Sequence, residues 1–538
     1  MLDIIIQGGQ IIDGTGAKAN RADLGVAGDR IAIIGDLGGR KAARRIDAAG
    51  RYVTPGFIDL HSHSDASVLS APRMESKVMQ GVTLEVTGNC GESAAPLGGE
   101  AVEDMERDLA RQEGGLSCDW RSVGEYLSKV EARGIATNYA TLAGHGTLRA
   151  GAVGHEMRAP KAAELDAMKG LLREALEEGA FGLSSGLIYP PSSYADTGEL
   201  VALASVAAPY GGFYASHIRN EGARLLEAVA EALEIGELAG VPVQLSHHKA
   251  SGRGNWGKVR ESLAMIEEAR GRGRDVTADQ YPYIASSTGL STVLPDWVHE
   301  GGTGALVGRL RDGAMRERIR AEIAGSGPGW ENPAMNNRWE SIVIAFCGSD
   351  PSLEGKSVSE IAQAAGEDPF DAAARLLVDN EGSVQVVMFS MCEEDVATVM
   401  RKAFVCVGSD STARAPSGPM SGGKPHPRCY GTFPRVLGRY VRELGVLGWE
   451  EAVRKMTGLS ASRLGLTDRG RLAEGAFADI VVFDPARVRD VATFADPHRF
   501  PEGIDAVIVN GTIAVEAGLH SGALAGRVLR RGRPSQHV

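Results

Sequence analysis

The chain has 538 residues, of which 43% are hydrophobic and 23% charged, and its formal net charge at pH 7 is −12. This composition is typical of a large globular protein with more than one domain, and the acidic balance without a basic stripe argues against nucleic-acid binding. No apolar run approaches the roughly 18 residues of a membrane-spanning helix, so no membrane segment is expected.

Both ends of the chain have the character of a small β domain. "DIIIQGGQIID" near the start and "IDAVIVNGTIAVEAG" near the end are apolar, β-branched runs broken by glycine. Such runs are typical of short strands joined by tight turns. We therefore expect residues 1–54 and 464–538 to build one β-sandwich domain, with a catalytic domain at residues 55–463 between them.

The start of the chain and the cysteines bear on location. "MLDIIIQGGQ" lacks the basic stretch, long apolar core and cleavage site of a signal peptide. The six cysteines, at positions 90, 118, 347, 392, 406 and 429, are scattered and form no Cys-x-x-Cys pair. This pattern favours a reduced chain over a disulfide framework, so we expect a cytoplasmic protein.

In the middle of the chain, apolar strand-like runs alternate with helix-like segments, which is the βαβ pattern of a parallel sheet covered by helices. Eight such runs occur, at residues 56–60, 82–88, 136–142, 180–185, 212–216, 241–246, 275–281 and 403–409. Eight units predict an α/β fold, a closed (β/α)8 barrel of the TIM type. The long gap before the last run predicts an insertion at about residues 285–400.

Metal-ligating side chains follow several of these strands directly. They are His61, His63, Cys90, His217, His247 and Asp410. One His-x-His in a strand is usually an ordinary half-buried segment, but the active site of such a barrel lies at the carboxyl ends of its strands. Imidazole, thiolate and carboxylate groups meeting there are the ligands that zinc takes. The sequence therefore predicts a metal site at this end of the barrel.

Several longer motifs carry a family resemblance. They are "GFIDLHSHSD", "GVTLEVTGNCGESAAPL", "FGLSSGLIYPPSSYADTGEL", "ASHIRNE", "LSHHKASG", "VTADQYPYIASSTGL", "VGSDST" and "HPRCYGTFPRVLGRYVRE". In order and spacing, over nearly the whole chain, they resemble the N-acyl-D-amino-acid deacylases (D-aminoacylases) of the amidohydrolase superfamily. The segment "STARAPSGPMSGGKP" after Asp410 departs from the family by its length and its glycine and proline content.

The resemblance implies a zinc enzyme that hydrolyses the amide bond of an N-acyl-D-amino acid. Cys90, His217 and His247 would hold one tightly bound zinc, and His61, His63 and Asp410 would face a second, weaker position. Asp410 would act as general base on the metal-bound water and then as general acid toward the leaving amine.

The resemblance also suggests the substrate contacts. Lys249 and Arg428 occupy positions that contact the substrate carboxylate in similar enzymes, and Arg can grip a carboxylate with two parallel hydrogen bonds. Tyr281 is a third candidate, with Tyr283 as the alternative if the strand register shifts. Tyr189 is expected to line the side-chain pocket, and His145 to lie in or behind it. His248, next to Lys249, is expected to be structural, and His426 is expected to position Arg428.

Three other functions remain open at this stage. A cyclic-amide hydrolase such as a hydantoinase or dihydropyrimidinase would need a bridging lysine, which Cys90 argues against. A hydrolase of unusual dipeptides is a second alternative, and a barrel that only binds an amino-acid derivative is a third. A serine hydrolase is disfavoured because the sequence has no G-x-S-x-G motif.

Overall fold

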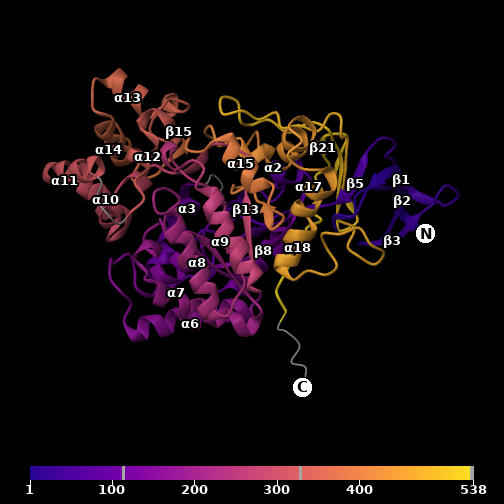
Figure 1. The fold of residues 1–538 in the computed structure, drawn as a ribbon, viewed down its shortest axis with the longest axis horizontal. Coiled ribbons are helices and arrows are strands. Elements are labelled where there is room, and N and C mark those ends of the chain that lie inside the picture. Colours follow the sequence, from indigo (N-terminus) through magenta and orange to yellow (C-terminus); the bar gives the residue numbers. More distant parts are fainter. Residues whose placement is uncertain (112–115, 326–329, 533–538) are drawn as a thin grey trace.

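A computed structural model describes residues 1–111, 116–325 and 330–532 of the chain. Figure 1 shows three parts: a β domain that holds the N-terminus, a barrel surrounded by helices, and an insertion that projects to one side as α10–α14. Among the described residues, no helix combines the length and the apolar character needed to cross a membrane.

The β domain is a nine-stranded sheet that takes strands from both ends of the chain. Its strands are β1 (Leu2–Ile11), β2 (Asn20–Ala27), β3 (Arg30–Gly35), β4 (Ala42–Asp47), β5 (Tyr52–Pro55), β18 (Ile480–Phe483), β19 (Ile504–Val509), β20 (Thr512–Glu516) and β21 (Leu519–His520). The two ends join where β18 pairs antiparallel with β5. Side chains from both ends, such as Ile6 and Ile508, fill one core. The expected β domain built from both chain ends is confirmed, and its limits at residues 54 and 463 stay a prediction.

The expected barrel is also confirmed. Its parallel strands are β6 (Phe57–Asp59), β7 (Val82–Thr87), β8 (Asn138–Thr141) continued by β9 (Ala143–Gly144), β10 (Gly182–Gly186), β11 (Phe213–His217), β12 (Val243–Leu245), β13 (Val276–Gln280) and β17 (Val405–Val407). A single bridge between Ser62 and Ser411 joins the first strand to the last and closes the ring. These strands are buried on both faces, which explains their nearly continuous apolar sequences.

Helices cover the outside of the barrel. They are α1 (Ser67–Ser70), α2 (Glu75–Val78), α3 (Gly99–Arg111), α4 (Val123–Arg133), α5 (His145–Ala152), α6 (Ala162–Glu177), α7 (Thr197–Ala207), α8 (Leu225–Ala239), α9 (Val259–Gly271), α15 (Glu393–Met400), α16 (Arg428–Arg435) with its π-helical continuation η8 (Val436–Glu443), α17 (Trp449–Met456) and α18 (Gly458–Leu464). Capping side chains start several of them: Ser122 accepts from Glu125 in a capping box at α4, and Asp196 accepts from Glu199 at α7.

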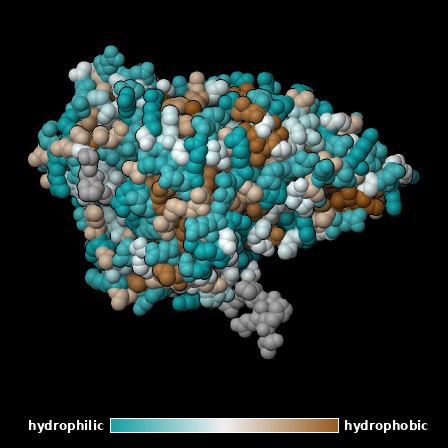
Figure 2. All heavy atoms as spheres, viewed as in Figure 1, coloured by the Kyte–Doolittle hydropathy of each residue, from teal (hydrophilic) through white to brown (hydrophobic). Residues whose placement is uncertain are grey.

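The insertion before β17 has a small core of its own. Its antiparallel sheet has the order β14 (Ser286–Gly289), β16 (Val384–Met388), β15 (Ile342–Cys347). Its helices are α10 (Gly302–Arg311), α11 (Gly313–Ala324), α12 (Pro333–Asn337), α13 (Val358–Ala365) and α14 (Pro369–Asp379). Figure 2 shows hydrophobic side chains only in small groups among hydrophilic ones on the face it presents.

Candidate metal centre

The six predicted ligand side chains lie together at the carboxyl ends of the barrel strands. His61 and His63 follow β6 and Cys90 follows β7. Of the other three, His217 ends β11, His247 follows β12 and Asp410 follows β17. Three of the six have a left-handed backbone, with φ of 52° at Cys90, 33° at His247 and 49° at Asp410. This conformation is costly for a residue with a Cβ and is concentrated at functional sites.

The ligand atoms form two groups that share Cys90. His61, His63, Cys90 and Asp410 make one group, and Cys90, His217 and His247 make the other, with the ligand atoms of each group within 4.8 Å of one another. Cys90 Sγ lies 3.3 Å from His61 Nε2 and 3.4 Å from His247 Nε2. The thiolate therefore stands between two places where a cation could bind.

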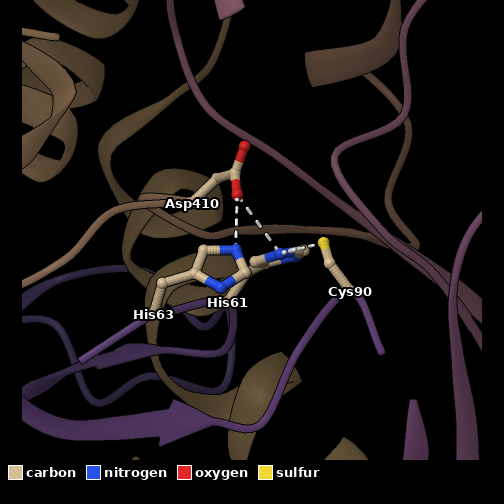
Figure 3. A group of neighbouring side chains, drawn as sticks. All are labelled: His61, His63, Cys90 and Asp410. Carbon is tan, nitrogen blue, oxygen red and sulfur yellow. Dashed lines mark hydrogen bonds and ion pairs between the residues drawn. The ribbon is translucent and has the colours of Figure 1, made fainter. Parts of the chain in front are cut away.

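Asp410 links the first group to a cation of the protein itself. Its Oδ1 lies 3.0 Å from His63 Nε2 and 3.4 Å from His61 Nε2, as Figure 3 shows. Its Oδ2 lies 2.8 Å from Arg428 Nη1. Burial alone would raise the pKa of Asp410, but Arg428, His247 and His61 together hold it well below its ordinary value. The group is an ionised carboxylate at neutral pH.

The electrostatics of the centre favour a bound cation. Burial would raise the pKa of the Cys90 thiol, but His61 and His247 hold it well below its ordinary value. Burial likewise disfavours a charged His61, yet Asp279, Cys90 and Asp410 hold its pKa well above its ordinary value. The centre thus takes up positive charge as protons, and a divalent cation would displace those protons from the same ligands.

His217 gives an independent test of whether a metal fits. Its ring is buried, and neither ring nitrogen has a hydrogen-bond partner among the described residues. Burial lowers the pKa of His217, so the ring is neutral and ready to donate a lone pair. A buried polar group without a partner is rare, and a metal would satisfy it. The thiolate of Cys90 with two imidazoles is a donor set that zinc takes.

The comparisons with known proteins identify the family. The sequence matches the Amidohydrolase family over residues 44–515. The chain belongs to this family. It is 40% identical to the D-aminoacylase of Alcaligenes xylosoxydans xylosoxydans over 98% of both chains. It is also 40% identical to the N-acyl-D-glutamate deacylase of the same organism, over 98% of this chain and 97% of that relative.

A solved structure extends this likeness to the fold. It is the N-acyl-D-glutamate deacylase from Bordetella bronchiseptica, complexed with zinc and a phosphonate inhibitor that mimics the tetrahedral intermediate of its reaction. That chain is 39% identical to this amidohydrolase, with a TM-score of 0.82 over 98% of this chain and 99% of the other. The amidohydrolase therefore has relatives in which metal binding is established.

The predicted substrate contacts lie beside the centre of this amidohydrolase. Tyr281 lies between two cations, with Arg428 4.6 Å and Lys249 5.7 Å from the centroid of its ring, and its buried hydroxyl has no hydrogen-bond partner among the described residues. Tyr283 instead packs under Arg435, 4.6 Å away, so the strand register favours Tyr281. Tyr189 packs edge-on against His217 at 5.0 Å.

Lys249 and Arg428 are buried in the centre and not solvated on the surface. Lys249 is paired with Glu221. Burial would raise the pKa of Glu221, but Lys249 and the neighbouring histidines lower it, so Glu221 is ionised. A substrate carboxylate would therefore meet a lysine that already has one partner, and Arg428 is likewise already paired with Asp410.

Neighbouring side chains hold the ring of His145, which disfavours direct substrate contact, one of the two places expected for it. Its Nδ1 lies 2.8 Å from Ser192 Oγ and its Nε2 3.0 Å from Glu199 Oε1, and its side chain is fully buried. Both ring nitrogens are occupied, so His145 has none left for a substrate. His248 bonds Ser262 Oγ at 2.8 Å, as expected of a structural residue, and the expected link of His426 to Arg428 is present as a 3.0 Å bond from the Arg428 amide to His426 Nδ1.

Two residues that the sequence analysis missed orient the ligands. Asp279 Oδ1 lies 3.0 Å from His61 Nδ1 and accepts the backbone N–H of His247 at 2.8 Å. Glu221 Oε1 lies 3.0 Å from His247 Nδ1. Asp279 thereby favours the His61 tautomer that leaves Nε2 free for a metal, whereas Lys249 Nζ also lies near His247 Nδ1, at 2.7 Å. Asp279 ends a barrel strand and Glu221 follows His217 by four residues, so the strand-end argument could have included both.

Proposed function

We propose that this amidohydrolase hydrolyses the amide bond of N-acyl-D-amino acids with zinc as its metal, giving a carboxylate and a free D-amino acid. One observation carries the proposal: a buried thiolate, Cys90, is shared by two groups of imidazoles beside an ionised Asp410. The specialised relatives support the substrate class, because the chain is equally identical to a D-aminoacylase and to an N-acyl-D-glutamate deacylase.

The residues assigned to the metal are those predicted from the sequence. Cys90, His217 and His247 would hold the tightly bound zinc, and His61, His63 and Asp410 would face a second, weaker position. When bound, zinc supplies a polarised substrate carbonyl and a water that is acidic near neutral pH. His217 supports the assignment most directly, because its buried ring nitrogens lack any other partner among the described residues.

Asp410 carries the proton in the proposed reaction. Its ionised Oδ1 would accept a proton from the attacking water and deliver it to the amide nitrogen as the carbon–nitrogen bond breaks. Arg428, 2.8 Å from Oδ2, keeps the carboxylate charged and fixes its direction. Burial of the centre limits competition from bulk water for these contacts.

Arg428, Tyr281 and Lys249 would bind the α-carboxylate of the substrate, with Tyr189 lining the side-chain pocket. Arg428 and Lys249 both lie near the ring of Tyr281, whose hydroxyl has no other partner among the described residues, and an anion would share each cation with the carboxylate already paired to it. The cyclic-amide alternative loses support because Cys90, not a lysine, lies between the two ligand groups. We also propose a cytoplasmic location, which is supported by six cysteines that are all free.

The proposal is tested by the release of free amine from N-acetyl-D-methionine and N-acetyl-L-methionine with zinc-loaded protein. Turnover of the D form alone is expected. N-acetyl-D-glutamate and N-acetyl-D-aspartate, assayed in parallel, then define the side-chain range. Turnover of a hydantoin with none of these linear amides would overturn the proposal in favour of a cyclic-amide hydrolase.

A further inference from the structure

A buried lysine that the reaction does not use lies next to the candidate centre. Lys77, on α2, is fully buried. Its Nζ donates to Asp59 Oδ2 at 2.8 Å, to Ser409 Oγ at 2.8 Å and to the Ser411 carbonyl at 2.8 Å. Ser62 Oγ lies 3.1 Å away and Glu85 Oε2 3.4 Å away. The ammonium thus joins groups from β6, β7 and the segment after β17.

These groups surround the one junction of the barrel that has no regular ladder. Among the described residues, β6 and β17 end their respective sheets, and the backbone pairing across this junction is the isolated Ser62–Ser411 bridge. The approach is close, because a Cβ on Gly408 would lie 2.6 Å from Cβ of His61. We call this junction of residues 59–63 with residues 408–411 the seam.

The seam sets the position of Asp410 relative to the two histidines. The Asp410 amide donates to the His61 carbonyl at 2.8 Å, and the His63 amide donates to the Ser411 carbonyl at 3.1 Å. That same Ser411 carbonyl accepts from Lys77. A shift of the Ser411 carbonyl would therefore move both Asp410 and His63.

Both chain neighbours of Asp410 are held by the same cluster. Ser409 donates its amide to Asp59 Oδ1 at 2.8 Å and its hydroxyl to Asp59 Oδ2 at 2.5 Å, and Ser411 donates its hydroxyl to Ser409 at 2.8 Å. Lys77 donates to both Asp59 and Ser409 and so belongs to the same network. The cluster therefore fixes Ser409 and Ser411, on either side of Asp410, whose backbone is strained at a φ of 49°.

Stability alone gives no reason for this charged cluster. A buried ion pair loses hydration energy that its attraction repays only in part, and apolar side chains of similar size often serve stability equally well. Lys77, Asp59 and Glu85 are all fully buried, so this cost is high. A cluster of fixed hydrogen-bond directions, in contrast, defines the geometry of the backbone that it binds.

We propose that Lys77 is a positioning residue, which holds Asp410 against His61 and His63 through Ser409, Ser411 and Asp59. The inference rests on the proposed role of Asp410 as proton carrier. Lys77 is therefore expected to affect the geometry of the weaker metal position and the rate of the chemical step. It should not affect the tight position of Cys90, His217 and His247, because none of its hydrogen bonds reaches those residues.

The test compares Lys77→Met with Lys455→Met. Lys455 is 1% exposed, and its Nζ donates to the Val405 carbonyl at 3.0 Å, at the opposite end of β17 from the seam. It is therefore a buried ammonium like Lys77 that makes no contact with the seam. For each protein we would measure kcat and KM for N-acetyl-D-methionine, zinc content after dialysis, and the affinity for a second equivalent of zinc.

Lys77→Met is expected to keep one zinc per chain and a KM close to that of the unmodified protein, with kcat lowered about 10- to 100-fold, the effect of a misplaced catalytic group. Its second zinc should bind about tenfold more weakly. Lys455→Met should change none of these. Unchanged kcat and unchanged second-zinc affinity in Lys77→Met would overturn the inference, as would equal losses in both variants.

Ser409→Ala is the second variant, for the case that Lys77→Met does not fold. It removes the Ser409 hydroxyl, which accepts from Lys77 and Ser411 and donates to Asp59, and it leaves the charges in place. A lower kcat at unchanged zinc content is expected, and an unchanged kcat would contradict the inference. If the unmodified protein turned over no N-acyl-D-amino acid, the proposed function would fail, while the second-zinc affinity of each variant would still test Lys77.

Discussion

Asp410→Asn tests the centre most sharply, because it changes charge and proton affinity with almost no change in shape. General acid–base catalysis by a positioned side chain contributes about 10²- to 10⁴-fold. At about 1.36 kcal/mol per factor of ten, its loss corresponds to roughly 3–5 kcal/mol of transition-state stabilisation. We expect kcat to fall by that factor while the zinc of Cys90, His217 and His247 is retained, since none of these residues is changed.

The substitution also breaks a buried ion pair, so stability has to be measured separately. Asp410 and Arg428 are 11% and 5% exposed, and removing one partner of such a pair costs on the order of 3–5 kcal/mol. Asp490→Asn is the matched control, because Asp490 pairs with Arg435 at the same 2.8 Å and is 13% exposed, outside the candidate centre.

Amine release and zinc content, measured at a temperature where both variants are folded, separate the two effects. Asp490→Asn should lose stability and keep kcat. A kcat for Asp410→Asn within threefold of the unmodified protein would refute the proton-carrying role, whatever the change in stability. Loss of the tight zinc in Asp410→Asn would refute the separation of the two ligand groups.

Cys90, Tyr281 and His248 can each be tested by one substitution. Cys90→Ala should weaken zinc binding by more than the about 10- to 100-fold expected for a residue behind a ligand, and unchanged zinc by elemental analysis after dialysis would exclude the thiolate as a ligand. Tyr281→Phe should raise KM about 3- to 10-fold with little change in kcat, as the loss of one hydrogen bond of about 1 kcal/mol predicts, and a lower kcat at constant KM would instead place the hydroxyl in the chemical step. Burial, with help from Lys249, lowers the pKa of His248 from 6.5 to about 4. Below pH 6.5 the unfolded chain binds a proton at this residue that the folded protein does not, so the contribution of His248 to stability is complete above pH 6.5 and is lost as the pH falls toward 4. Metal-free protein should therefore lose about 2 kcal/mol between pH 7 and pH 5 through this group. His248→Gln should remove that part of the loss in denaturant titrations, and an identical pH dependence in both proteins would contradict the assignment.

The barrel strands and the types of the candidate ligand residues could be predicted from local sequence patterns. Eight apolar runs could be found because parallel strands buried on both faces are nearly continuous in apolar residues. The six candidate ligand residues could be predicted because the carboxyl ends of parallel barrel strands meet on one side, whatever the details of the fold. Both arguments need only neighbouring residues and a rule that holds for every such barrel.

The groups that support the candidate ligands could not be predicted, because they depend on contacts between distant parts of the chain. His61 meets Asp279 across 218 positions of sequence, and Lys77 meets Ser409 across 332, so neither contact leaves a local pattern. His145 follows a barrel strand as closely as the ligands do, yet Ser192 and Glu199 occupy its ring. Closing the ring fixes which distant polar groups are buried together, and burial obliges each of them to find a partner within hydrogen-bond reach.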